Sequence, residues 1–164
     1  MFDCITFLLR AVPFYVQLLI VYFVLPGLVG IYISPFSAAV VSLGFCSAAY
    51  VSQMVRGGIN GINKGQWEAA QMLGYSKMQT LQYIIVPQVV RIILPALLGE
   101  CDQLLKSTAI ISAIGVLELT GAARNIIAQE LNPLTMYTVI AVMYVCMSSI
   151  MAIFAGLVER RYQL

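Results

Sequence analysis

Long apolar stretches, separated by short polar segments, make up most of the chain. No charged residue occurs between Arg10 and Arg56, and none between Leu131 and Val158. About 20 consecutive apolar residues are enough for a helix to cross a bilayer. The pattern therefore predicts about four membrane-spanning helices, near residues 11–31, 36–55, 84–105 and 134–158.

Prolines, glycines and polar residues mark the expected boundaries of these spans. Pro26-Gly27 and Ser34-Pro35 should separate the first span from the second, because both pairs interrupt helices. The apolar piece 108–117 is too short to cross a membrane alone. We therefore expect a broken or re-entrant segment over 107–130 on the outer side, which a membrane tolerates only where protein or a water-filled cavity covers it.

Composition supports lipid as the natural surroundings of the chain. Hydrophobic residues make up 61% of it and charged residues only 10%, whereas about a quarter of the residues in a soluble domain are charged. We expect an all-α integral membrane protein with a single domain over 1–164. A net charge of +2 does not argue for nucleic acid, and the absence of histidine excludes His-based catalysis and His-ligated metals. No metal site and no enzymatic activity are expected.

The distribution of lysine and arginine predicts the orientation of the chain. The segment 56–80 carries Arg56, Lys64 and Lys77, whereas residues 27–35 carry no basic residue. Short cytoplasmic loops are enriched in such residues. We therefore place the segment 56–80 and both termini in the cytoplasm.

The segment 56–80 has the signals of a helix, a sharp elbow and a second helix. Residues 66–73 favour a helix with Glu68 in its first turn, and Gly74 can adopt the left-handed conformation that ends it. Ser76 and Gln79 have the spacing of a capping box for the next helix. With Trp67 and Met72 exposed, the elbow would be a docking surface for a partner. The alternative is an amphipathic helix lying on the lipid headgroups.

The spacing of this segment resembles the EAA signature of ABC importer permeases. Glu68-Ala69-Ala70, then Gly74, then Ile84-Ile85-Val86-Pro87 match that signature, with Val86 where the family prefers leucine. Four further stretches resemble its polar-amino-acid branch, the glutamine/arginine/histidine type: Arg56-Gly57-Gly58-Ile59, Lys64-Gly65-Gln66-Trp67, Leu105-Lys106-Ser107-Thr108 and Ile114-Gly115-Val116-Leu117-Glu118-Leu119-Thr120. The resemblance covers about residues 10 to 161.

The resemblance implies a type I (MetI-like) helix bundle, with the usual first span of the family missing before Arg10. The chain would be the permease subunit of a binding-protein-dependent importer for polar amino acids in the bacterial cytoplasmic membrane. Its implied partners are a cytoplasmic ABC ATPase, a second permease copy or a homologous permease, and a periplasmic or lipid-anchored amino-acid-binding protein. The resemblance also implies a set of residues that contact the ATPase and drive alternating access: Trp67, Glu68, Ala69, Ala70 and Gly74. No cofactor is expected in the chain itself, since it has no phosphate-binding loop and ATP would bind to the ATPase.

Ionisable residues at membrane depth are the first candidates for substrate contacts, because their burial is costly. Asp102 and Lys106 are four residues apart and could simply pair on one helical face. Alternatively, Lys106 or Glu118 could meet the charged ends of an amino acid. The candidates for the pathway are Lys106, Thr108, Ser112, Glu118 and Asn125.

Two other function classes remain open from the residues alone. An ion-coupled secondary carrier would use Glu100, Asp102 or Lys106 for ion coupling and would need no ATPase. A structural membrane subunit would transport nothing, and substitutions at Glu68 or Gly74 would then leave uptake unchanged.

Overall fold

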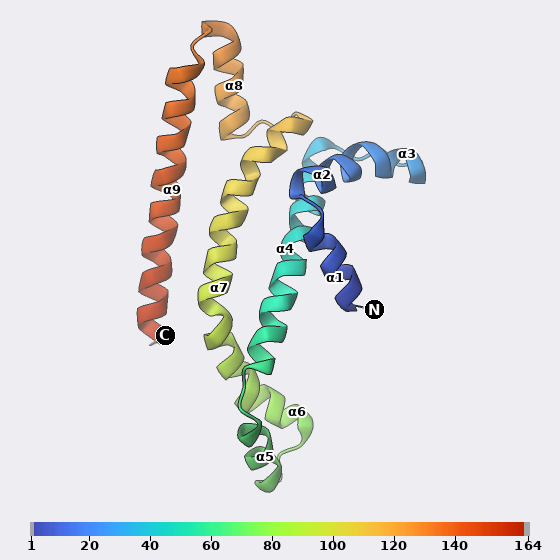
Figure 1. Cartoon of the computed structure of the whole chain (residues 1–164), viewed down its shortest axis with the longest axis vertical. Coiled ribbons are helices and arrows are strands. Elements are labelled where there is room, and N and C mark those ends of the chain that lie inside the picture. The colour runs from blue at the N-terminus through green and yellow to red at the C-terminus, as the bar shows by residue number, and fades with distance from the viewer. Residues whose placement is uncertain (1, 163–164) are drawn as a thin grey trace.

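The computed structural model describes residues 2–162, and every regular element in this range is a helix (Figure 1). Three helical stretches are long and apolar enough to cross a membrane: Pro35–Asn60, Lys77–Ile114 and Pro133–Arg161. A bent pair near the N-terminus is a fourth candidate. The predicted class of all-α membrane protein is confirmed.

The elements follow one another with short connections. In chain order they are α1 (Phe2–Ala11), α2 (Phe14–Leu19), the π-helical η1 (Ile20–Val24), α3 (Leu25–Val29), α4 (Pro35–Asn60), α5 (Lys64–Met72), α6 (Lys77–Gln79), the π-helical η2 (Thr80–Ile85), α7 (Val86–Ser107), the 3-10 helix η3 (Thr108–Ile114), α8 (Leu119–Glu130) and α9 (Pro133–Tyr162).

The helix α7 is the centre of the bundle, with α4 packed on one side and α9 on the other. Figure 1 shows α5 and α6 as a protrusion beyond one end of α4 and α7, which we call the elbow end. The segments α2–α3 and α8 lie toward the opposite, far end. None of the most apolar window of α9 is buried inside the chain, so this helix offers an open apolar surface suited to lipid or another subunit.

The segment predicted as the first span, near 11–31, is bent at its start. Residues 5–11 and 14–29 are two helical stretches that meet at 104° (Figure 1). Pro13 precedes α2 and has no N–H to continue the helix. The side chain of Gln17 stabilises the bend by donating from Nε2 to the carbonyl oxygens of Leu9 at 2.5 Å and Val12 at 2.7 Å. Pro13 cannot donate to the carbonyl oxygen of Leu9, and the side-chain amide of Gln17 donates to it instead.

The break between the first two predicted spans lies at residues 30–34, because the chain stays helical through Pro26-Gly27 until Gly30, which has a φ of 71°, and α4 begins at Pro35 after its N-cap Ser34. The π-helical η1 comes directly before the turn that contains Pro26. In the same way, η2 comes directly before Pro87. A proline removes one backbone hydrogen bond, and local π-helical turns are a known way for apolar helices to accommodate that loss.

Close packing of α4 on α7 near the elbow depends on Gly58. This glycine is buried, and a Cβ placed on it would lie 2.5 Å from Cγ2 of Ile93 and 3.1 Å from Cγ1 of Val89. Small residues at such positions let membrane helices approach closely. The two helices that carry the elbow are therefore held together directly above it.

We expect Gly58→Ala to lower thermal stability, and the adjacent Gly57→Ala to leave it unchanged or raise it. The methyl group at position 58 must displace Ile93, and overpacking of this kind costs about 1–3 kcal/mol. At position 57 no heavy atom lies within 4 Å, and alanine favours a helix over glycine. Thermal unfolding of the two purified variants in detergent measures the difference. Equal melting temperatures would contradict the packing described here.

Candidate functional site

The elbow between α5 and α6 is built by local capping interactions. The side chain of Asn63 caps α5, with Oδ1 accepting from the N–H of Gly65 at 2.8 Å. Gly74 follows this helix with a φ of 79°. Ser76 and Gln79 then form a reciprocal capping box, with distances of 3.3 Å and 2.9 Å. The predicted helix, elbow and capping box are confirmed.

Two details of the predicted first helix are corrected. The helix α5 begins at Lys64 rather than at residue 66, so Glu68 lies beyond its first turn. Trp67, which was expected to be exposed, is half-buried. Its indole packs against a cluster formed by residues of three different segments: Ile62, Ile85, Val89 and Ile93.

The inner face of α5 fixes the elbow to the start of the long helix. Ala70 is only 1% exposed, and Trp67 contributes the aromatic part of the same face. Gln88 adds a polar contact, donating from Nε2 to Oε1 of Gln66 at 3.4 Å. Because α6 continues through η2 into α7, the elbow and the 38-residue helix Lys77–Ile114 behave as one packed unit.

The outer face of the elbow is open and largely apolar. Met72 is 91% exposed and Leu73 is 75% exposed, and Glu68 and Ala69 are exposed beside them. We call these four residues the elbow tip. Of the five residues predicted to couple, Glu68, Ala69 and Gly74 are therefore exposed, whereas Trp67 and Ala70 face inward.

The five predicted pathway residues do not form one site. The Nζ of Lys106 pairs with Oδ2 of Asp102 at 2.5 Å, so the internal pair is the alternative that the structure shows. Thr108 donates from Oγ1 to the carbonyl oxygen of Leu105 at 2.6 Å, and it borders a different hollow between α4 and α7.

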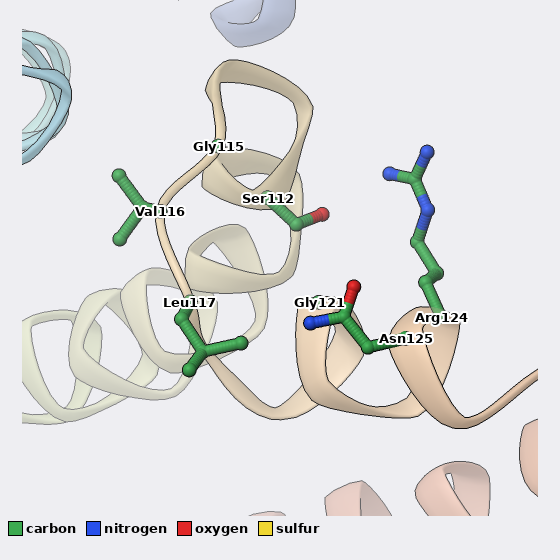
Figure 2. A pocket seen from close by; sticks show the side chains of 7 residues that line it. All are labelled: Ser112, Gly115, Val116, Leu117, Gly121, Arg124 and Asn125. Atoms are coloured by element: carbon green, nitrogen blue, oxygen red, sulfur yellow. The ribbon is translucent and has the colours of Figure 1, made fainter. Parts of the chain in front are cut away.

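Ser112 and Asn125 come together at the far end of the bundle. They line a cavity of about 320 Å³ where η3 turns into α8, together with Arg124 and the turn at Gly115. Figure 2 shows the side chains of Ser112, Arg124 and Asn125 around this hollow. Gly115 has a φ of 85°, which favours glycine and lets the chain reverse between η3 and α8.

Glu118 has a structural role as the N-cap of α8. Its carboxylate oxygens accept from the backbone N–H groups of Thr120 at 2.8 Å and Gly121 at 2.7 Å. The hydroxyl of Tyr144 on α9 donates to the same carboxylate at 3.3 Å. A negative charge at a helix N-terminus is favourable. The carboxylate therefore holds α8 against α9, and its hydrogen-bonding capacity is largely used.

Two features escaped the sequence reasoning. Leu73 belongs to the exposed tip, and its position just after the last residue of α5 was the available signal. Arg10 lines a cavity between α1, α4 and α7 together with Tyr50 and Glu100. A single arginine at the edge of a long uncharged stretch was the signal for this second feature.

Comparisons with known proteins agree with this architecture. The chain matches the family described as "Binding-protein-dependent transport system inner membrane component" over residues 1–164. It is 40% identical to the probable amino-acid ABC transporter permease protein YckA of Bacillus subtilis, over 94% of this chain and 68% of that protein. It is 38% identical to the arginine transport system permease protein ArtQ of the same organism, over 97% of this chain and 73% of that protein.

Solved structures give the same result. One that is described as an amino acid ABC transporter with histidines has a TM-score of 0.90 and 36% identity, over 97% of this chain and 74% of that one. The MetNI methionine ABC transporter in an inward-facing conformation has a TM-score of 0.80 at 22% identity, over 98% of this chain and 73% of that one, a likeness of fold. The chain belongs to the family of binding-protein-dependent transport system inner membrane components, and it is a multi-pass permease subunit of an ABC importer.

Proposed function

We propose that the chain is the permease of an importer for polar amino acids in the bacterial cytoplasmic membrane. Its partners are a cytoplasmic ATPase subunit, a second copy or a related permease, and a binding protein on the outer side. Relatives named for arginine and glutamine transport support this substrate class. The resemblance of the elbow to the EAA signature supports the ATPase partner.

The observation that carries the proposal is an exposed apolar tip on a rigidly held elbow. Met72 and Leu73 project from the outer face of α5, while Trp67 and Ala70 hold its inner face against the chain. A displacement of the tip by a bound partner is therefore passed to the helix Lys77–Ile114. An exposed apolar patch on a protrusion marks a protein-binding surface.

The charge pattern supports a cytoplasmic position for this elbow. Arg56, Lys64 and Lys77 lie on or beside it, and α9 runs back toward the elbow end to finish with Arg160 and Arg161 (Figure 1). Basic residues near the ends of membrane spans favour the cytoplasmic side. An ATPase has access to its nucleotide only there.

Transport follows from thermodynamic linkage between ATP binding to the ATPase and the conformation of the docked elbow. ATP binds the closed form of an ATPase pair more tightly than the open form, so it shifts the population of the docked elbow as well. The elbow transmits that shift to α4 and α7, which are packed together at Gly58. The bundle then exchanges between outward-open and inward-open states.

Reconstitution tests the proposal. The permease, purified with its ATPase and placed in proteoliposomes with the binding protein, should accumulate radiolabelled arginine or glutamine when ATP is supplied on the ATPase side. Non-hydrolysable nucleotide should support no accumulation. Uptake driven by an ion gradient without ATP, or no uptake of any of the common amino acids, would overturn it.

A further inference from the structure

The segment η3 is an unusually long 3-10 helix at the far end of the bundle. It covers seven residues, Thr108–Ile114, and it continues α7 without a break. Runs of 3-10 helix longer than three or four residues are uncommon, because their hydrogen-bond geometry is poorer than that of an α-helix. Residues 108–114 contain no glycine or proline and include two alanines, the residue that favours an α-helix most. The local sequence therefore does not require the 3-10 form.

Packing of η3 against α2 and α4 accounts for the 3-10 form. Side chains three residues apart lie on one line in a 3-10 helix, whereas in an α-helix they diverge by about 60°. Ile111 and Ile114 are three residues apart, and they are only 8% and 5% exposed. Both belong to an apolar cluster with Leu18 of α2 and with Ala38 and Ala39 of α4. The 3-10 geometry thus allows both isoleucines to close the far end of the bundle.

The opposite side of η3 has room for a change of shape. Ser112 and Gly115 border the cavity of about 320 Å³ between η3 and α8 (Figure 2). No heavy atom lies within 4 Å of a Cβ built on Gly115, so the turn after η3 is loosely surrounded. The helix α8 is held to α9 separately, through Glu118 and Tyr144. The end of η3 can therefore move without displacing α8 from α9.

We propose that η3 is a two-state segment, which opens the far end when it converts from a 3-10 helix to an α-helix. Conversion of its seven residues shortens the segment by about 3.5 Å. Counted from Thr108, it also turns Ile114 by about 120° away from the cluster, and it brings Ser112 to within about 40° of the direction that Ile114 leaves. A hydroxyl group then replaces an apolar side chain at the contact with α2 and α4, so the far end is no longer sealed.

The conformation of η3 follows the nucleotide state of the ATPase. The elbow and η3 lie at the two ends of one continuous helix, Lys77–Ile114, so a shift of the docked elbow reaches η3 directly. The 3-10 form belongs to the nucleotide-free complex and the α form to the ATP-bound complex. This inference rests on the proposed function, and it adds the element through which the elbow opens the far end.

Single cysteines at two positions test the conversion. Two complexes carry Ser112→Cys or Ile114→Cys in a permease whose four native cysteines are changed to alanine. Without nucleotide, N-ethylmaleimide should label position 112 faster than position 114, because Ser112 borders a cavity and Ile114 is buried. ATP with vanadate, which traps the ATPase pair in its closed form, should reverse this order. Ile93→Cys is the control, since Ile93 is 7% exposed near the elbow and its slow labelling should not change.

An apolar side chain at position 112 should favour the α form even without nucleotide. In Ser112→Leu the new side chain has room in the cavity while η3 is a 3-10 helix, and it takes the place of residue 114 in the cluster when η3 is an α-helix. Labelling of Ile114→Cys in this background should therefore rise by about fivefold or more. Ser112→Asn is the matched polar control, and it should leave the labelling of Ile114→Cys unchanged.

The outcomes separate failure of this inference from failure of the proposed function. Each variant must co-purify with the ATPase. A rigid tilt of η3 would raise the labelling rates at 112 and 114 together, and that result would overturn the conversion. So would an unchanged order of labelling in a complex that accumulates amino acids with ATP, while the importer function would stand. If ATP drives no uptake at all, the proposed function fails, and this inference fails with it.

Discussion

Changing Met72 and Leu73 together to aspartate should release the ATPase subunit while leaving the membrane bundle folded. The two side chains are 91% and 75% exposed, so the permease alone loses almost no packing. In the complex they would be apolar anchors, and truncating such anchors typically costs about 2 kcal/mol or more each. A buried, unpaired carboxylate adds to that loss. We expect the ATPase affinity to fall by about a hundredfold or more.

Co-purification of tagged permease with the ATPase measures this effect, and thermal unfolding of the permease alone checks its fold. Leu117→Asp is a matched control, because Leu117 is also exposed, at 71%, but lies at the far end of the bundle. This control should keep the ATPase. Retention of the ATPase by the Met72 and Leu73 double variant would mean that the elbow tip is not the docking surface.

Gly74→Val should leave the permease in the membrane and attached to its ATPase, yet separate ATP hydrolysis from uptake. The φ of Gly74 is 79°, and no heavy atom lies within 4 Å of a Cβ built there, so the obstacle is backbone strain and not a clash. A residue with a Cβ pays about 1–2 kcal/mol in that conformation, and a β-branched residue is a clear outlier there. The angle of the elbow would relax, and uptake per ATP hydrolysed should fall by about tenfold.

Gly74→Asn is the control for this prediction. Asparagine tolerates the left-handed conformation better than other residues with a Cβ, so this variant should keep most of the coupled uptake. Paired measurements of ATP hydrolysis and amino acid uptake in proteoliposomes give the ratio for each variant. Normal coupling in Gly74→Val would contradict the role of a fixed elbow.

The elbow could be predicted from the sequence because its signals are local. Gly74 ends α5, and Ser76 caps the next helix with Gln79, through bonds that span only a few residues. The burial of Trp67 could not be predicted in the same way. It depends on Ile85 and Val89, which reach the indole only after the chain has folded back on itself.

The prolines show the same division between local and distant causes. Pro13 and Pro26 have the same chemistry, yet the chain bends at the first and stays helical through the second. The bend at Pro13 is stabilised by the side chain of Gln17. At Pro26, the backbone hydrogen bond that proline cannot make is accommodated by the π-helical turn η1 just before it. Hydropathy alone contains neither piece of information, so the expected span near 11–31 carried no bend at Pro13.

The candidate substrate contacts were only partly predictable for a related reason. The pair of Asp102 and Lys106 follows from a spacing of four residues on one helix. The cavity of Arg10 and Glu100 joins positions 90 residues apart, on α1 and α7, and no periodic pattern connects them. Glu118 was singled out as an ionisable group at membrane depth, and its charge proved to serve the N-terminus of α8.

Labelling of a single cysteine at the elbow tip tests the central claim most directly. In a permease with Met72→Cys and its four native cysteines changed to alanine, a membrane-impermeant maleimide should fail to label right-side-out vesicles. The same reagent should label inside-out vesicles stripped of the ATPase, and rebinding of the ATPase should block it. Labelling from the outer face, or labelling that the ATPase leaves unchanged, would contradict a cytoplasmic lever at residues 64–79.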